Sequence, residues 1–483
     1  MFWRGVWGYL PANIVQGVVG FLAIVIFTRV LSPEDFGRYA LAYSILTLSH
    51  VAVFSWLEAA MARFWAAEQT PDGLAAHFAS LYRTAFRLTL LFLPAAALIL
   101  WVWPMDPGFR TVVAVAVAGI PIRSFAKLAM ERYRAAGEVT RAARLDMATT
   151  VGGLVIGVLF ALGGAGGAAP LAGLLLAPLI TLPFILPGEL RHIRGARVDR
   201  VRLRSYAVYG YPIAASLALA VVLSSTDRFL LAAFMNEAAV GAYHAGYSLA
   251  NRTLDVLFIW LGAAGTPALV MALERGGGER LKTAAREQAA TFLLIGLPAA
   301  AGVALVAGPL TEVMIGEDLR RVAAAITPWI ALSALLSGLT TYYFHQAFTL
   351  GRRTGLLLAA MAVPALANIG LNLLLIPAFG VMGAAWATAA SFGLGLLASI
   401  AIGRRVLALP VPWETLARCG VATGAMALAV SALPAPGGLI ELMLDATIGA
   451  VVYALVALTL NAAGVRDVAG RILATARTRS VPS

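Results

Sequence analysis

The sequence predicts an all-α polytopic membrane protein with about 14 transmembrane helices. The 483 residues are 60% hydrophobic and only 12% charged, and the mean hydropathy is +0.85. A soluble domain carries about 25% charged residues, so this chain has too little charge to cover a water-facing surface, and it has too much apolar surface to be disordered. The 47 Gly and 23 Pro show no period, which excludes a collagen-like or low-complexity chain.

Fourteen apolar runs, separated by charged residues or by Gly and Pro, have about the length that a spanning helix needs. The first run continues past residue 25 without a small-residue cleavage site, so we interpret it as a retained helix rather than a signal peptide. The expected spans are 9–31, 39–61, 84–103, 111–130, 146–163, 169–187, 208–232, 240–265, 289–308, 323–346, 355–376, 381–402, 417–433 and 439–460.

The net charge of +12, from 36 Lys and Arg against 24 Asp and Glu, has a topological explanation. With the N-terminus in the cytoplasm, five cations lie on the opposite side or its border: Arg29, Arg38, Arg110, Arg320 and Arg321. Four lie inside the spans: Arg123, Lys127, Arg228 and Arg252. The remaining 27 of the 36 lie in cytoplasmic segments, in agreement with the positive-inside rule. We therefore expect both termini in the cytoplasm and no nucleic-acid partner.

Short motifs recur in the same order six predicted helices apart. Residues 37–44 and 241–248 both fit G-x-Y-x-x-x-Y-S, and residues 164–169 and 380–385 share G-x-x-G-A-A. Because six is an even number, the two copies share one orientation, which predicts a parallel repeat about an axis along the membrane normal. We expect two six-helix lobes and two further C-terminal helices with a cytoplasmic tail, with the boundaries 1–204, 205–405 and 406–483.

The chain lacks the motifs of an ATP-driven pump or an enzyme. The two lysines, Lys127 and Lys282, are not preceded by glycine, so no G-x-x-x-x-G-K-[ST] phosphate loop exists. The five histidines have no metal-binding spacing, and the single cysteine, Cys419, excludes an internal disulfide. We expect no catalytic residue, no metal and no cofactor, and the short polar connections favour transport over catalysis.

Charged side chains inside the spans must have a partner or a function that offsets their cost, since a charge at the bilayer centre costs about 2.5–3.5 kcal/mol on insertion scales. Two interpretations stay open for them. They form ion pairs within a lobe or reach an interface, or they line a water-filled cavity in which arginine forks bind phosphate oxygens. Asp255, three residues after Arg252, can pair with it along the helix. The candidates for ion pairing or for coupling to an ion are Glu58, Lys127, Asp227 and Asp255.

Three segments carry a family resemblance. They are residues 28–40 (TRVLSPEDFGRYA), residues 226–243 with TDRFL and VGAY, and residues 368–385 with NIGLN and IPAFGVMGAA. They resemble the polysaccharide (O-antigen, Wzx-type) flippases of the multidrug/oligosaccharidyl-lipid/polysaccharide exporter superfamily. The resemblance implies a bacterial inner-membrane transporter that moves an undecaprenyl-diphosphate-linked oligosaccharide from the cytoplasmic to the periplasmic leaflet. It also implies that polysaccharide polymerase and chain-length proteins are partners, and that the product is lipopolysaccharide O-antigen or exopolysaccharide.

The resemblance implies a cationic cavity but no invariant residue set, and its candidates here are Arg29, Arg123, Arg228 and Arg252. A drug/sodium or drug/proton antiporter shares the twelve-helix core, but such proteins often use an acid in the first helix, and 9–31 has none. A lipid II flippase shares fourteen helices and a cationic cavity, but its early arginine pattern is missing between Trp7 and Thr28. A membrane scaffold for glycan-assembly enzymes is the alternative of a different class.

Overall fold

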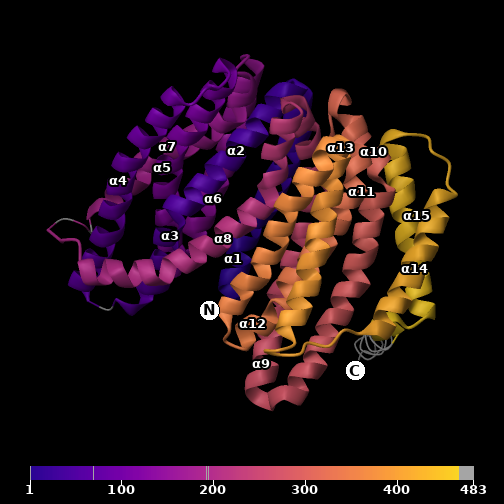
Figure 1. Cartoon of the computed structure of the whole chain (residues 1–483). Helices are drawn as coiled ribbons and strands as arrows, with labels where there is room; N and C mark the ends of the chain where they lie inside the picture. Colours follow the sequence, from indigo (N-terminus) through magenta and orange to yellow (C-terminus); the bar gives the residue numbers. More distant parts are fainter. Residues whose placement is uncertain (1, 69, 192, 194, 467–483) are drawn as a thin grey trace, which may run out of the picture. The chain divides into compact units, whose positions relative to one another are not determined.

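The computed structural model describes residues 2–466 apart from residues 69, 192 and 194, so the predicted C-terminal tail from residue 467 lies outside the described residues. The described residues are mostly helical and contain no strand (Figure 1). The helices of the first half are α1 (Phe2–Val30), α2 (Pro33–Val53), α3 (Ser55–Phe64), α4 (Pro71–Val102), α5 (Pro107–Ala135), α6 (Val139–Leu162), α7 (Ala169–Arg191) and α8 (Arg200–Phe234). Those of the second half are α9 (Glu237–Leu305), α10 (Ala307–Met314), α11 (Glu317–Leu339), α12 (Gln346–Leu350), α13 (Thr354–Gly403), α14 (Trp413–Ser431) and α15 (Gly438–Thr459).

The predicted fold class is confirmed. Ten helices are long and apolar enough to cross a membrane, and α2 with α3, bent by 49°, adds an eleventh span. Dividing α9 at Gly277 and α13 at Gly380, where φ is 63° and 57°, makes thirteen, and α14 is the fourteenth. Both glycines have a backbone conformation that other residues rarely adopt, which is why each long segment turns there.

Several spans start earlier than the apolar runs predicted because a polar cap begins each helix. Ser32, Thr70 and Asp106 each accept a hydrogen bond from the backbone N–H three residues later, at 3.0–3.1 Å, and each is followed by proline. A capping side chain with proline at the first helical position is a strong helix start. α4 therefore begins at Pro71 rather than near residue 84, and its first turns are polar.

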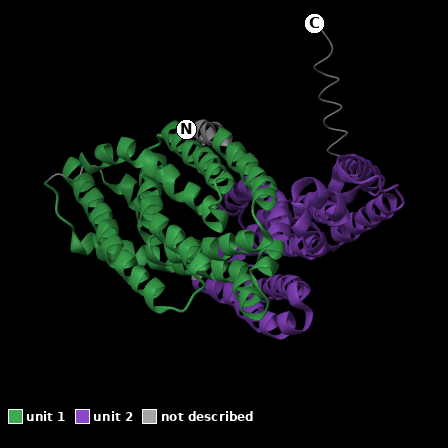
Figure 2. Ribbon diagram, turned by 90° about the horizontal axis from the view of Figure 1, so that it is seen from above, with its two compact units in different colours: residues 1–244 green, residues 245–483 purple. Residues whose placement is uncertain are grey.

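The chain divides into two compact units, residues 1–244 and 245–483 (Figure 2). α8 packs on α2 and α3, so it belongs to unit 1 in this division. The predicted lobe boundary after residue 204 follows the sequence repeat, and it stays a prediction. Unit 1 has its core around Phe54, Tyr82 and Ile120, and unit 2 has one of its cores around Phe292 and Tyr343.

The two copies of the first repeated motif touch each other inside unit 1. A Cβ placed on Gly37 would collide with the Glu237 carbonyl oxygen, and a Cβ on Gly241 would collide with the Pro33 carbonyl oxygen. The Cβ at each glycine would also lie 3.1 Å from the backbone nitrogen of the other. This reciprocity is what a two-fold relation between equivalent segments produces, so the start of α2 and the start of α9 cross at their glycines.

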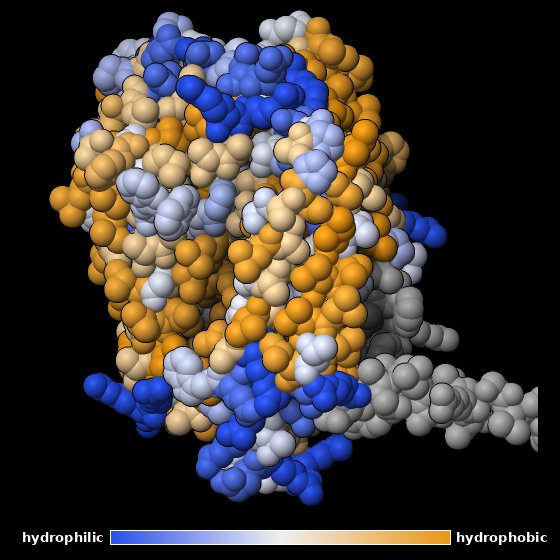
Figure 3. Space-filling model, turned by 90° about the vertical axis from the view of Figure 1, so that its right-hand side faces the viewer, coloured by the Kyte–Doolittle hydropathy of each residue, from blue (hydrophilic) through white to orange (hydrophobic). Residues whose placement is uncertain are grey.

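Large apolar side chains cover the outer surface. Figure 3 shows a broad hydrophobic band on one face, with hydrophilic residues gathered at both of its ends. Leu91, Trp101, Phe184 and Leu428 are each more than 70% exposed. Exposure on this scale is unfavourable in water but is expected where lipid tails cover the helices, so the chain is a multi-pass membrane protein.

Candidate functional site

Ionisable side chains inside the spans of unit 1 gather on α2, α3 and α5. The Nε2 atom of His50 lies 2.9 Å from Oε1 of Glu58, and its Nδ1 atom lies 3.1 Å from the Ser124 hydroxyl. His50 and Ser124 are each 4% exposed. We call these three residues the His50 triad.

The bend between α2 and α3 explains why sequence spacing did not reveal the His50 triad. His50 and Glu58 are eight residues apart, which is a rise of about 12 Å on a straight helix. The helix axis bends by 49° at the break next to Phe54, and the two side chains meet across it. Ser124 comes from α5, 74 residues further on, and no local pattern in the sequence connects it to His50.

Arg123 and Lys127 follow one another along α5, next to Ser124. Within the described residues neither cation has a carboxylate within 4 Å, and Nη1 of Arg123 is buried without a hydrogen-bond partner. Arg123 lies 16 residues from the start of α5 and 12 from its end, about 24 Å and 18 Å along the axis. This guanidinium therefore lies deep in a spanning helix with unfilled capacity for an anion.

Glu131 and Arg134, further along α5, belong to a separate chain of contacts. Nη1 of Arg134 lies 2.8 Å from Glu131 and its Nη2 atom lies 3.8 Å from Asp146 on α6. Gln16 on α1 donates to Asp146 at 2.6 Å. The acid nearest to Lys127 in sequence is thus engaged with Arg134, which leaves Lys127 without an ion pair among the described side chains.

Asp227 and Arg228 are adjacent in α8 and have different partners, both inside unit 1. The Tyr243 hydroxyl donates to Asp227. Nη1 of Arg228 donates to the Ser224 carbonyl at 2.9 Å and lies 3.5 Å from the Ser44 hydroxyl. Asp227 is fully buried and Arg228 is 7% exposed. In this conformation these contacts hold both side chains in helix packing, and a role of Arg228 in a cavity stays a prediction.

The ion pair expected between Arg252 and Asp255 in α9 is not formed. Asn251, four residues before Asp255, donates to its carboxylate at 2.5 Å, and this bond satisfies the acid along the same helix face. Arg252 is exposed and has no carboxylate within 4 Å among the described residues. Arg29 is also exposed, and its Nη1 atom donates to the Val25 carbonyl at the end of α1.

Arg132, also on α5, forms the ion pairs that are typical of a cation with a structural role. Its Nη2 atom lies 2.5 Å from Glu189 on α7, and its Nη1 atom lies 2.5 Å from Glu138. Glu189 is fully buried and also accepts from the Tyr82 hydroxyl at 3.1 Å. Every charge here has a counterion, which contrasts with Arg123, nine residues or about two and a half turns away on the same helix.

The comparison with protein families identifies the family to which this chain belongs. Residues 26–324 match the model of a family described as "Polysaccharide biosynthesis protein". The chain belongs to this family. The comparison with curated proteins finds no match.

Solved structures share the fold of this family member. A structure titled "Lipid II flippase MurJ, inward closed conformation" is similar with a TM-score of 0.76 at 12% identity, over 95% of this chain and 99% of that one. An inward-facing multidrug resistance MATE family transporter of the MOP superfamily is similar with a TM-score of 0.67 at 16% identity, over 80% of this chain and 94% of that one. Identity this low shows the fold alone. The two solved proteins are a flippase and a multidrug transporter, and this chain shares their fold.

Proposed function

We propose that this member of the polysaccharide biosynthesis family flips an undecaprenyl-diphosphate-linked oligosaccharide from the cytoplasmic to the periplasmic leaflet of a bacterial inner membrane. The family match and the flippase-type fold support a transporter in polysaccharide biosynthesis. The 27 cations of the predicted cytoplasmic segments support the orientation. We place polysaccharide polymerase and chain-length proteins beside it, as consumers of the flipped lipid for O-antigen or exopolysaccharide.

The unpaired side chain of Arg123 is the observation on which we base the proposal of an anionic, phosphate-containing substrate. Arg123 is half-buried, and its Nη1 atom is buried without a hydrogen-bond partner. An unpaired buried donor is unfavourable, so this donor is ready for an anionic ligand. The planar fork of arginine matches phosphate oxygens in a bidentate geometry. A diphosphate linkage offers such oxygens, whereas a cationic drug would be repelled. Arg29, Arg228 and Arg252 stay candidate contacts for the same head group.

The membrane potential is the first driving force to consider for such a substrate. An inside-negative potential favours outward movement of an anion by about 2.3 kcal/mol per charge per 100 mV. Two diphosphate charges would gain roughly twice that. Flipping then requires no ATPase, in keeping with a sequence that contains no phosphate-binding loop.

The His50 triad is our proposal for the site where a proton couples to the movement. The single proton of the Ser124 hydroxyl has two acceptors in reach, the Ile120 carbonyl at 2.8 Å and Nδ1 of His50 at 3.1 Å. When it goes to Nδ1, one proton remains between Nε2 and the carboxylate of Glu58. When it goes to Ile120, Nδ1 can donate a proton of its own to the hydroxyl oxygen. If the proton between Nε2 and Glu58 is also kept, the triad holds one more. The two arrangements differ by one proton.

Lys127, Asp227 and Asp255 are the remaining coupling candidates. Asp227 and Asp255 accept from Tyr243 and Asn251, so each would have to break a hydrogen bond to bind an ion. Lys127 lies on α5, three residues after Ser124 of the His50 triad. We rank it as a modulator of the triad rather than as an independent site.

The test is complementation of a strain without its own flippase, with surface polysaccharide and accumulated lipid-linked oligosaccharide as readouts. The wild-type chain should restore the polysaccharide. Arg123→Ala should lower flux at least tenfold at an unchanged membrane level, and Arg123→Lys should restore part of it. Lys282→Ala, which removes an exposed cation paired with Glu279, is the matched control and should behave as wild type.

The other candidate functions predict different results in the same strains. Restored drug resistance without polysaccharide would identify a multidrug antiporter, and rescue of a lipid II flippase deletion would identify that activity. A scaffold that moves nothing would tolerate Arg123→Ala. Each of these outcomes would replace the proposal.

A further inference from the structure

Two helix-ending turns of the chain have the same hydrogen bonds but different residues. At the end of α5, Glu138 N–H donates to the Tyr133 carbonyl at 2.8 Å and Gly137 N–H to the Arg134 carbonyl at 3.1 Å. At the end of α12, Arg353 N–H donates to Phe348 at 2.8 Å and Arg352 N–H to Thr349 at 3.2 Å. Both turns are Schellman motifs, in which the residue after the cap has a left-handed backbone.

The second turn places arginine where the first uses glycine. The φ angle is 75° at Gly137 and 54° at Arg352. A side chain in this region crowds the backbone, so glycine is the usual residue there. Arg352 is one of three non-glycine residues with positive φ in the described part of the chain. The positive-inside rule concerns only the number of cations in a cytoplasmic loop. It therefore does not explain why an arginine occupies the left-handed position of this turn.

The next residue reverses the charge between the two turns. Glu138 lies within 2.5 Å of Arg132 and 3.1 Å of Arg141, and it neutralises that loop. Arg353 occupies the equivalent position of the second turn, and the chain after α13 adds Arg404 and Arg405. Over residues 195–466 none of these side chains has a carboxylate within 4 Å.

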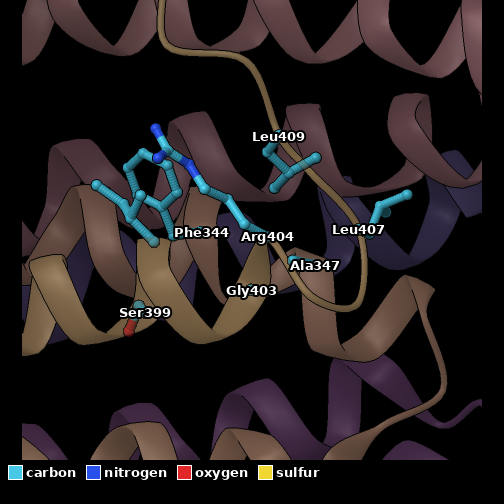
Figure 4. Close-up of a pocket in the computed structure, with 8 residues that line it drawn as sticks. Phe344, Ala347, Ser399, Gly403, Arg404, Leu407 and Leu409 are labelled. Carbon is cyan, nitrogen blue, oxygen red and sulfur yellow. The ribbon is translucent and has the colours of Figure 1, made fainter.

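The unpaired arginines surround a hollow in unit 2. Arg352, Arg353 and Arg405 line an open space of about 730 Å³ with Gly351 and Gly355. We call this space the arginine hollow. Beside it, Figure 4 shows Arg404 extending past the Phe344 ring above the buried Ser399. Arg404 lines this second pocket and not the arginine hollow, to which the next residue, Arg405, belongs.

We propose that the arginine hollow binds the phosphate of an anionic lipid head group, one without a neutralising cation, at the membrane surface. Three unpaired guanidinium groups around one space favour a phosphate ester over a monovalent ion, because each fork can engage two oxygens. The arginine hollow lies at the ends of the apolar helix α13, where head groups are found. The left-handed backbone at Arg352 is a second feature of a kind that clusters at ligand sites. Arg123 does not line the arginine hollow, and the proposal does not depend on which lipid is transported.

The decisive variant converts the second turn into the first. Arg352→Gly with Arg353→Glu reproduces the Gly137-Glu138 pair, and it should fold because glycine suits the left-handed position. Full-length protein in detergent is titrated with phosphatidylglycerol and, separately, with inorganic diphosphate, and bound lipid is counted by native mass spectrometry. Wild type should retain phosphatidylglycerol against phosphatidylcholine, and the double variant should bind it at least tenfold more weakly. Lys282→Ala is the control for loss of one surface cation and should bind as wild type.

The two titrations distinguish a phosphate that belongs to a lipid head group from a free phosphate. Binding of phosphatidylglycerol alone indicates a lipid head group, and its displacement by millimolar diphosphate indicates recognition of the phosphate itself. Diphosphate binding without lipid binding would overturn the lipid assignment. Equal binding by wild type and the double variant would overturn the site. Should the double variant not fold, Arg353→Gln with Arg405→Gln leaves the turn unchanged, and the same loss of binding is expected.

Discussion

Replacing Gly37 with alanine tests the reciprocal crossing between the start of α2 and the start of α9. The new Cβ would collide with the Glu237 carbonyl oxygen, a backbone atom that a rotamer change cannot move. Overpacking of this kind costs about 1–3 kcal/mol, and we take the upper value because both atoms belong to helices. Alanine gains about 1 kcal/mol over glycine inside a helix, so the expected net loss of unfolding free energy is about 2 kcal/mol.

The assay is denaturant titration of the purified chain in detergent micelles. Gly241→Ala should behave as Gly37→Ala, because its Cβ meets the Pro33 carbonyl in the same manner. The double variant should lose less than the sum, since one displacement relieves both collisions. Gly17→Ala, with no atom within 4 Å of its Cβ, is the control and should stabilise the chain. If Gly37→Ala stabilised the chain as Gly17→Ala does, the close crossing would be refuted.

The remaining predictions use the same preparation. Glu189→Gln should cost about 1.5–3 kcal/mol, because it removes the charge that Glu189 presents to Arg132 while Glu138 still pairs with that arginine; an unchanged denaturation midpoint would contradict this. Glu58→Gln should flatten the pH dependence of flipping in proteoliposomes while the protein stays folded, whereas a pH profile identical to wild type would remove the His50 triad from coupling. Gly380→Ala should cost about 1–2 kcal/mol, since φ is 57° there; no change would show that the turn inside α13 tolerates a side chain.

The fold was predictable because a spanning helix is long, apolar and local in sequence. The repeat was visible in the motif that contains Gly37 and Gly241, but the contact between those two glycines was not, since it depends on how distant helices cross. Helix starts were placed too late at α4, where a polar cap and proline extend the helix beyond its apolar run. Composition measures the apolar part of a helix and not its full length.

The functional site was predictable only in part. Arg123 stood out because a charge in the middle of a span is rare, and the structure gives it no acidic partner among the described residues. His50 and Ser124 did not stand out, because a bent helix and a distant helix bring them to Glu58. The expected pair of Arg252 with Asp255 failed because Asn251 reaches the carboxylate first. Partners across helices are set by packing, which helical spacing does not report.

Transfer of a polyprenyl-diphosphate oligosaccharide between leaflets by the purified chain is the direct test of the proposed function. Proteoliposomes carry the labelled lipid in one leaflet under an inside-negative potential, and its arrival in the other leaflet is measured with an impermeant reagent. Wild type and Lys282→Ala should transfer the lipid, and Arg123→Ala should transfer it at least tenfold more slowly. Equal transfer by Arg123→Ala, or no transfer by folded wild type, would contradict it.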